Sequence, residues 1–241
     1  MNVIITENYE SMSKEAAKIV VDTMSKKINA VLGLATGSTP EGMYAELCRS
    51  YNKGEISFRA VNSVNLDEYY PISATNNQSY RYFMNKNLFD KVDINKSNTY
   101  VPNGEAKDAA AECKSYDELI ASLGGIDLQI LGIGRNGHIG FNEPNGELIP
   151  VTHLTSLTES TIESNSKYFP TPSDMPRSAL TMGIGTILNA KKIVIMASGK
   201  EKHEAILKML TGKVTTMWPA TMLNLHNDVT LICDRRAYYG E

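Results

Sequence analysis

The sequence predicts an α/β fold with a mostly parallel sheet and helices on both of its faces. Short runs rich in β-branched residues alternate with longer amphipathic runs, which is the order expected of strands joined by crossover helices. The strand runs are apolar almost throughout, as in strands that are covered on both faces. No Pro-, Gly- or Ser-rich linker divides the chain, so we expect a single domain over residues 1–241.

The expected elements follow one another in a βα rhythm. Strands are predicted at residues 2–6, 30–35, 61–66, 127–132, 192–197 and 229–233. Helices are predicted at residues 10–27, 40–51, 79–92, 106–123, 179–189 and 202–210. Residues 144–178 break the rhythm with five prolines and one short helix near 158–166. We expect them to form a lid segment over a binding site, with a surface excursion of no function as the alternative.

Composition and charge narrow the classes of function. Hydrophobic residues make up 42% of the chain, charged residues make up 21%, and the net charge is −3. Nucleic acids and acidic membranes bind proteins with a basic excess, so we expect neither partner, whereas a small phosphorylated metabolite needs only a few local cations. The three cysteines show no disulfide or metal spacing, and the N-terminus lacks the features of a signal peptide. We therefore expect a cytoplasmic protein with no metal site.

Residues 34–40, LATGSTP, join a predicted strand to a predicted helix. Gly37 permits a tight turn, and Ser38 or Thr39 can cap the helix. A strand that ends in glycine and hydroxyl residues before a helix aims backbone N–H groups at one point, which attracts an anion such as phosphate. The alternative is simply a well-capped helix.

Residues 198–202, SGKEK, repeat this strand, glycine and helix order and add cations. Lys200 and Lys202 could hold a phosphate as point charges. Lysines in the first turn of a helix are mildly unfavourable, which favours a functional interpretation over a solvated helix start.

Two carboxylates follow the third predicted strand, in NLDEY at residues 65–69. Ligands of open α/β sheets bind beyond the carboxyl ends of the strands. There, Asp67 or Glu68 could accept a proton from a substrate carbon if it is partly desolvated. A helix cap or solvated turn is the alternative.

The most specific motif is LGIGRNGHIGFNEP, residues 131–144. Four glycines let the backbone come close to a ligand, and the imidazole of His138 can release and regain a proton near neutral pH. Glu143 could couple to that imidazole, and Asn136 offers an uncharged amide. The alternative is a glycine-rich turn with an incidental histidine. A dinucleotide site is disfavoured because no acidic residue ends a predicted strand about twenty residues after the glycines.

Together these motifs resemble the glucosamine-6-phosphate deaminase family, from Met1 to about Asp234. The most specific stretches are residues 34–44, 65–70, 131–145 and 179–188, and the segment around Lys202. The resemblance implies a modified Rossmann-like fold. It also implies the reversible conversion of glucosamine 6-phosphate to fructose 6-phosphate and ammonia without a cofactor, by an aldose–ketose isomerising hydrolase of amino-sugar catabolism.

The resemblance also implies roles for the acid–base residues. Asp67 matches the group that moves a proton between C2 and C1 of the open-chain sugar. His138 matches the residue that opens the sugar ring, with Glu143 and Asn136 assisting. Larger, regulated members carry an aspartate at position 136, so charge coupling to His138 is expected to come mainly from Glu143.

For the substrate phosphate, the resemblance implies five binding residues: Gly37, Ser38, Thr39, Lys167 and Lys202. Many members have an arginine in place of Lys167, so the charge is kept there but bidentate geometry is lost. The chain also lacks the C-terminal extension and basic effector residues of the allosteric branch. We therefore expect an unregulated, short-form enzyme that is a monomer or a small homo-oligomer.

Three other functions stay open at this point. A 6-phosphogluconolactonase has a similar fold, but Glu143 within FNEP would have no obvious task in lactone hydrolysis. A galactosamine-6-phosphate deaminase is poorly separated by sequence. A non-catalytic sugar-phosphate sensor could use a related fold, but it would not need Asp67, His138 and Glu143 together.

Overall fold

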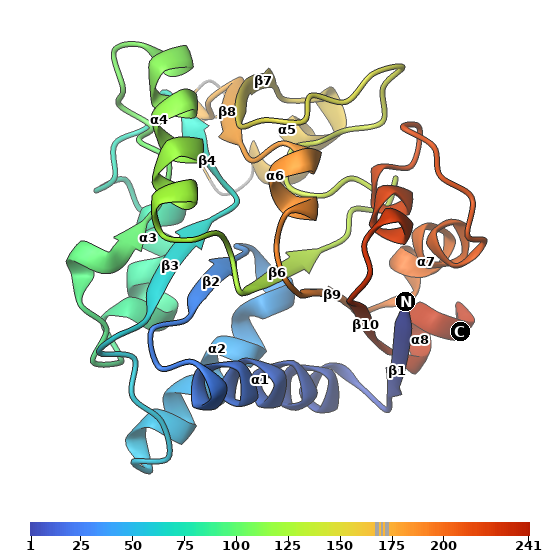
Figure 1. The fold of residues 1–241 in the computed structure, drawn as a ribbon. Coiled ribbons are helices and arrows are strands. Elements are labelled where there is room, and N and C mark those ends of the chain that lie inside the picture. Colours follow the sequence, from blue (N-terminus) through green and yellow to red (C-terminus); the bar gives the residue numbers. More distant parts are fainter. Residues whose placement is uncertain (167–168, 170, 172–173) are drawn as a thin grey trace.

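The computed structural model describes residues 1–166, 169, 171 and 174–241. Within these residues, seven parallel strands form the central sheet, in the order β1-β10-β9-β6-β2-β3-β5 (Figure 1). They are β1 (Asn2–Thr6), β2 (Val31–Leu34), β3 (Asn62–Asn65), β5 (Thr99–Tyr100), β6 (Leu128–Gly132), β9 (Ile193–Ala197) and β10 (Val229–Asp234). A small antiparallel sheet has the order β4-β8-β7, with β4 (Asp67–Tyr70), β8 (Ser178–Thr181) and β7 (His153–Ser156).

Helices lie on both sides of the central sheet. They are α1 (Tyr9–Lys26), α2 (Ser38–Asn52), α3 (Tyr80–Met84), α4 (Ala109–Ser122), α6 (Ile184–Leu188), α7 (His203–Leu210) and α8 (Arg235–Tyr239), whereas α5 (Glu159–Ser166) packs with the small sheet. Asn85–Phe89 (η1) continues α3 as a π-helix, and Lys96–Asn98 (η2), Lys200–Lys202 (η4) and Pro219–Leu225 (η5) are short 3₁₀ helices. The predicted α/β architecture is therefore confirmed.

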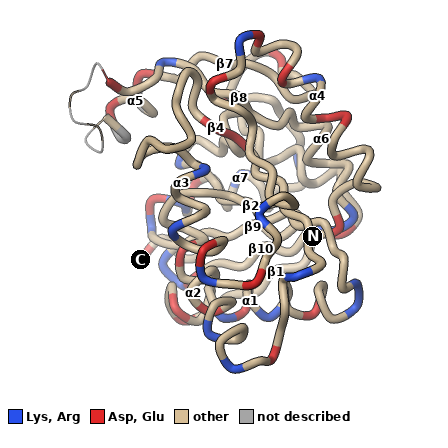
Figure 2. Tube along the Cα trace, turned by 90° about the vertical axis from the view of Figure 1, so that its left-hand side faces the viewer, with Lys and Arg blue, Asp and Glu red and all other residues tan. Residues whose placement is uncertain are grey.

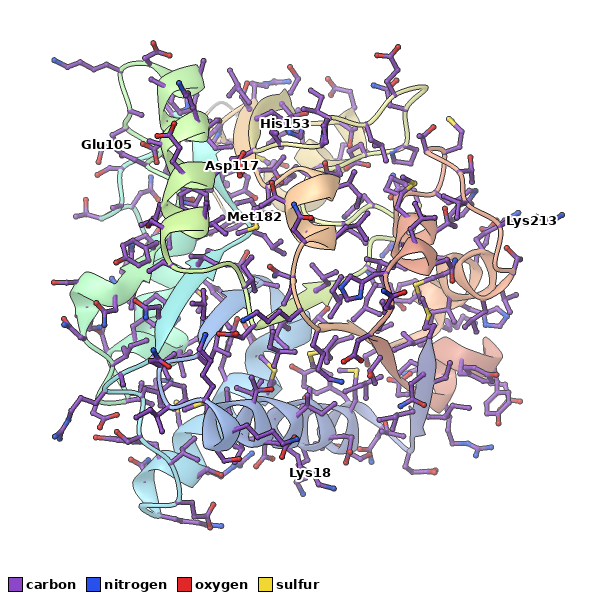
Figure 3. All side chains as sticks on the ribbon, in the orientation of Figure 1. Lys18, Glu105, Asp117, His153, Met182 and Lys213 are labelled. Carbon is purple, nitrogen blue, oxygen red and sulfur yellow. The ribbon has the colours of Figure 1, made fainter. Side chains whose placement is uncertain are left out.

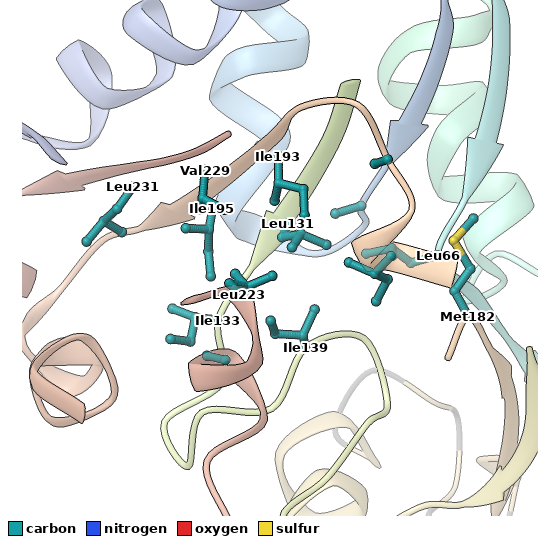
Figure 4. Close-up of a cluster of buried hydrophobic side chains, with 14 of the residues drawn as sticks. Leu66, Leu131, Ile133, Ile139, Met182, Ile193, Ile195, Leu223, Val229 and Leu231 are labelled. Carbon is teal, nitrogen blue, oxygen red and sulfur yellow. The ribbon is translucent and has the colours of Figure 1, made fainter. Parts of the chain in front are cut away.

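Alternate residues of each strand enter two different cores, because successive side chains of a strand point to opposite faces of the sheet. On β9, Val194 and Met196 pack with α1 and α2, whereas Ile193 and Ile195 pack on the other face with α4, α6 and α7. Figure 4 shows part of this second core, where Ile133 and Ile139 follow β6 and meet Leu223. The loop after β6 is thus anchored by buried apolar side chains at the point where the sheet ends.

The sequence order of the strands reverses between β2 and β6. The chain passes from β2 to β3 on one side, and from β6 to β9 on the other. In open α/β sheets such a reversal leaves a crevice at the carboxyl ends of the strands, where ligands bind. The motifs at residues 34–40 and 131–144 follow these two strands directly.

Two predictions of secondary structure need correction. Residues 179–189, predicted as one helix, begin in β8 and become helical only at Ile184, because β8 pairs with both β4 and β7. Pairing on both sides outweighs a local helical pattern. Asp67 and Glu68 do not end the third strand: β3 stops at Asn65, and Asp67 is the first residue of β4 in the small sheet.

Residues 144–178 contain the predicted short helix, α5, and also β7, which the sequence reasoning missed. Leu157, Ile162 and Phe169 from this segment pack with Tyr69 of β4 in a small apolar cluster. Asp117 of α4, labelled in Figure 3, accepts hydrogen bonds from the backbone N–H and hydroxyl of Thr152 just before β7. The described part of the segment is therefore built into the small sheet.

Candidate active site

Asp67 lies buried at the start of β4, with 6% of its surface exposed. Burial, and secondarily the neighbouring charge of Glu68, raise the pKa of Asp67 to about 8. In the ladder with β8, Asp67 lies opposite Thr181. A carboxyl group with this pKa can act as a base or an acid near neutral pH, which an exposed aspartate does poorly.

Glu68 has different hydrogen-bond partners from those of Asp67, and it links two elements of the fold. Its carboxylate accepts hydrogen bonds from the backbone N–H groups of Tyr69, Tyr80 and Arg81, so it joins β4 to the start of α3. Burial raises the pKa of Glu68 to about 7, although these three donors and the Arg81 guanidinium oppose that shift. Of the two carboxylates in the motif, Asp67 is therefore the candidate base.

The loop that carries His138 is a compact turn held by its own backbone. Gly134 donates to the carbonyl of His138 over 2.9 Å, and Gly137 donates to the carbonyl of Gly134 over 3.0 Å. A Cβ atom on Gly134 would lie 2.3 Å from Nδ1 and Cε1 of His138, so the imidazole lies directly over this glycine. Ala220 of η5 donates to the Gly137 carbonyl and fixes the tip of the turn.

Glu143 contacts two polar side chains of this loop, His138 and Asn136. Its Oε1 lies 3.3 Å from Nδ1 of His138, and its Oε2 accepts a 2.7 Å hydrogen bond from Nδ2 of Asn136. The Oδ1 atom of Asn136 accepts in turn from the backbone N–H of His138. Burial would raise the pKa of Glu143, but His138, Asn136 and Thr161 together hold that pKa below its usual value. Glu143 therefore places a negative charge beside the imidazole.

The small sheet brings Asp67 against the His138 loop. A Cβ atom on Gly140, two residues after His138, would lie 3.3 Å from Oδ2 of Asp67 and 3.0 Å from Oγ1 of Thr181. The Thr181 hydroxyl also accepts a 3.1 Å hydrogen bond from the backbone N–H of Phe141. Thr181 therefore contacts the loop and pairs across the ladder with Asp67.

The loop after β2 presents the beginning of α2 to the same end of the sheet. Gly37, with a φ of +88°, precedes the helix, and no side chain caps the first turn. Ser38 and Thr39 were predicted as possible caps, but they are the first two residues of the helix. A Cβ atom on Gly132, at the end of β6, would lie 4.0 Å from Oγ1 of Thr39. An uncapped helix start with two hydroxyl residues suits an anion.

Lys202 lies half-buried at the end of η4, after β9. Burial lowers the pKa of Lys202, Glu201 opposes this shift, and the nearby charge of Arg135 adds to it. The influence of Arg135 places Lys202 close to the His138 loop. The preceding turn is fixed by Asp234, which accepts from the Ser198 hydroxyl over 2.5 Å and from the Gly199 N–H.

The structure thus brings eight of the nine predicted site residues to the carboxyl ends of β2, β3, β6 and β9; the ninth, Lys167, lies outside the described residues. Sequence reasoning missed Thr181, Arg135 and Asp234, of which only Asp234, an acidic residue ending an apolar strand, gave a signal.

Within the part of the chain that the structure describes, no three His, Cys, Asp or Glu side chains are grouped closely enough to hold a metal ion. None of the described helices has the length and apolar character needed to span a bilayer. Figure 2 shows lysine and arginine interspersed with aspartate and glutamate on the outer helices and loops. The three cysteines, Cys48, Cys113 and Cys233, are free and buried.

An open parallel sheet with titratable side chains at its switch point, beside an uncapped helix start, is typical of α/β enzymes that carry out acid–base chemistry on small anionic substrates. The comparisons with known proteins agree with this class. The chain belongs to the family of glucosamine-6-phosphate isomerases and 6-phosphogluconolactonases, which it matches over residues 6–232.

Among its relatives, a glucosamine-6-phosphate deaminase of Clostridium perfringens (strain 13) is 55% identical over 237 residues, which cover 98% of each chain. One of Thermoanaerobacter sp. (strain X514) is 54% identical and covers 98% of this chain and 94% of its own. A solved structure described as a monomeric glucosamine-6-phosphate deaminase is 46% identical, with a TM-score of 0.97 over all of both chains.

Lactonase structures are more distant. The 6-phosphogluconolactonase of Trypanosoma cruzi is 21% identical, with a TM-score of 0.76, and it covers 99% of this chain and 96% of its own. At that identity the likeness concerns the fold alone. The relatives at 55% and 54% identity are deaminases by name, so the predicted resemblance to the deaminase branch is confirmed.

Proposed function

We propose that this protein converts glucosamine 6-phosphate to fructose 6-phosphate and ammonia, reversibly; its relatives' names, glucosamine-6-phosphate deaminase, support the substrate and the loss of ammonia. The observation that supports this most directly is the meeting of two acid–base groups. Asp67, buried with a raised pKa, lies against the loop on which Glu143 contacts His138. A 6-phosphogluconolactonase would have no evident use for Glu143, and a sensor would need neither group.

The proposed chemistry assigns one proton transfer to each group. His138, with its charge balanced by Glu143, moves a proton between the C1 hydroxyl and the ring oxygen, which opens the ring to the aldehyde. Asp67 then removes the proton from C2, the electrons of that bond form the C1=C2 double bond, and the C1 oxygen takes up a proton from the C2 ammonium group, which gives the enolamine. Returning the proton to C1 gives a C1 alcohol and an imine at C2. Water adds to the imine and ammonia leaves, so the last step is a hydrolysis.

Anchoring of the phosphate is proposed for Gly37, Ser38, Thr39, Lys202 and Lys167. The uncapped start of α2 offers backbone N–H groups, and Lys202 offers a cation from the neighbouring loop. Held at its phosphate end, the short sugar would keep C1 and C2 beside the two acid–base groups, which lowers the entropic cost of reaction.

An ammonia-release assay tests the proposed function. The purified protein is offered glucosamine 6-phosphate, galactosamine 6-phosphate and 6-phosphogluconolactone in parallel. We expect ammonia and fructose 6-phosphate from the glucosamine substrate. Ammonia from galactosamine 6-phosphate alone would show that the substrate is the galactosamine compound. Hydrolysis of the lactone without ammonia release would favour a lactonase. Tight binding with no product would favour a sensor.

The raised pKa of Asp67 predicts the pH dependence of kcat/KM for glucosamine 6-phosphate. A base acts as the carboxylate, and Asp67 loses its proton only near pH 8, so kcat/KM should rise with pH up to about that value. The charge of Glu68 contributes to the raised pKa, so Glu68→Gln should move the midpoint of the rise to lower pH. Rates measured from pH 5.5 to 9.5 that are flat in the wild type would contradict a buried Asp67 base.

Four further features remain proposals. We infer one domain over residues 1–241, with residues 144–178 forming the lid segment over the site. We also infer a monomer or small homo-oligomer in solution, in line with the relative described as monomeric. We also propose that the protein is located in the cytoplasm. Because of its composition and proposed substrate, we expect it to bind small sugar phosphates and neither nucleic acid nor a membrane.

A further inference from the structure

Glu143 has a third partner, which comes from outside the His138 loop. Thr161, the third residue of α5, donates its hydroxyl hydrogen to Oε1 of Glu143 over 3.1 Å. The hydroxyl of Thr158, just before α5, donates to the Thr161 hydroxyl over 3.0 Å. Because the Thr161 oxygen accepts from Thr158, its own hydrogen is directed at the carboxylate, and such chains strengthen each member.

The oxygen that Thr161 contacts is the one that faces the imidazole. Oε1 of Glu143 lies 3.3 Å from Nδ1 of His138, whereas Oε2 is held by Asn136. Thr161 is buried, with 8% of its surface exposed, so water does not readily replace its hydroxyl. Since position 136 carries a neutral amide, the charge beside His138 is that of Glu143, and the orientation of this carboxylate matters all the more.

We propose that Thr161 is a positioning residue for the acid–base pair: from α5, its hydroxyl holds Oε1 of Glu143 toward His138 and keeps that carboxylate ionised. A hydrogen bond donated to a carboxylate stabilises its charged form, and fixing one oxygen restricts the rotation of the side chain. His138 is the titratable group that lies against Glu143 among the described residues. The kinetic part of this proposal rests on the proposed deaminase function.

The test compares two variants that lack the donor, Thr161→Val and Thr161→Ala, with Thr161→Ser, which keeps it. Ser166→Ala is the matched control, because the Ser166 hydroxyl lies on the same helix but contacts the Glu163 carbonyl. Losing a hydrogen bond to a charged group should lower kcat for glucosamine 6-phosphate about tenfold. KM should change by less than about twofold, because Thr161 is not among the phosphate-binding residues.

A second readout needs no turnover. Carboxyl ¹³C NMR titration of the ligand-free protein should show the pKa of Glu143 raised by about half a unit or more in the valine and alanine variants. Thr161→Ser should restore both kcat and this pKa, and Ser166→Ala should change neither. An unchanged Glu143 titration in Thr161→Val, or a serine variant as impaired as the valine variant, would overturn the proposal. If the wild type releases no ammonia, the proposed function fails, while the titration still decides the role of Thr161.

Discussion

Asp67→Asn is expected to reduce ammonia release about 10³-fold or more, which is within the range found when a general base is removed. Asparagine has nearly the same shape as aspartate, but it cannot accept the C2 proton. Substrate binding should persist, because the described residues that we propose to bind the phosphate follow β2 and β9, whereas Asp67 lies on β4. The measurements are kcat by ammonia release and the affinity for the substrate by calorimetry. Turnover near the wild-type rate would remove Asp67 from the mechanism.

The same substitution should affect stability in a pH-dependent way. Burial raises the pKa of Asp67 to about 8, so the ionised form is disfavoured in the folded state. The contribution of this group to stability is complete below its unfolded pKa, near 4, and is lost as the pH rises through 8. The amide side chain of the Asp67→Asn variant does not ionise, so the variant does not lose stability in this way as the pH rises. Relative to the wild type, the Tm of Asp67→Asn should therefore be higher at pH 9 than at pH 5, by about 2–4 °C for each kcal/mol relieved.

Gly134→Ala is expected to lower kcat about 100-fold by displacing the imidazole of His138. The new Cβ would lie 2.3 Å from two ring atoms, far inside van der Waals contact, so the ring must leave its position beside Glu143. The φ angle of Gly134 is not positive, so alanine fits its backbone and the fold should persist. The effect should appear in kcat rather than in phosphate affinity.

Gly146→Ala is the matched control for this prediction. No atom lies within 4 Å of a Cβ placed on Gly146, and its φ is likewise not positive. It should keep wild-type kcat, and both variants should unfold within a few degrees of the wild type. If Gly134→Ala were fully active, the orientation of His138 seen here would not matter for catalysis.

The central sheet was predictable because most of its strands lie in short runs of mainly apolar residues. Six of its strands overlap the predicted ranges, and the two-residue β5 is too short to give a pattern. The small sheet was missed for a different reason. Asp67–Tyr70, His153–Ser156 and Ser178–Thr181 are short and partly polar, and they become strands only by pairing with one another across a long stretch of sequence.

The candidate site divides in the same way. The sequence offered local signals for Gly37–Thr39 and Asp67, which follow predicted strands. It also offered one for His138, which lies in a glycine-rich loop. Thr181 and Thr161 carry no such signal, because a threonine becomes informative only when folding places its hydroxyl against a backbone amide or a carboxylate. Contacts of this kind depend on tertiary structure and cannot be obtained from spacing.

The small sheet has a consequence for how the protein tolerates sequence change. The β4 strand carries Asp67, and β7, joined to it through β8, leads directly into α5 and its contact with Glu143. A shift in the β7–β8 register would thus disturb both of the groups that we propose to transfer protons, even though neither β7 nor β8 contains them. Loop insertions that are meant to leave activity unchanged should spare these strands and be placed in connections on the opposite, amino-terminal rim of the large sheet.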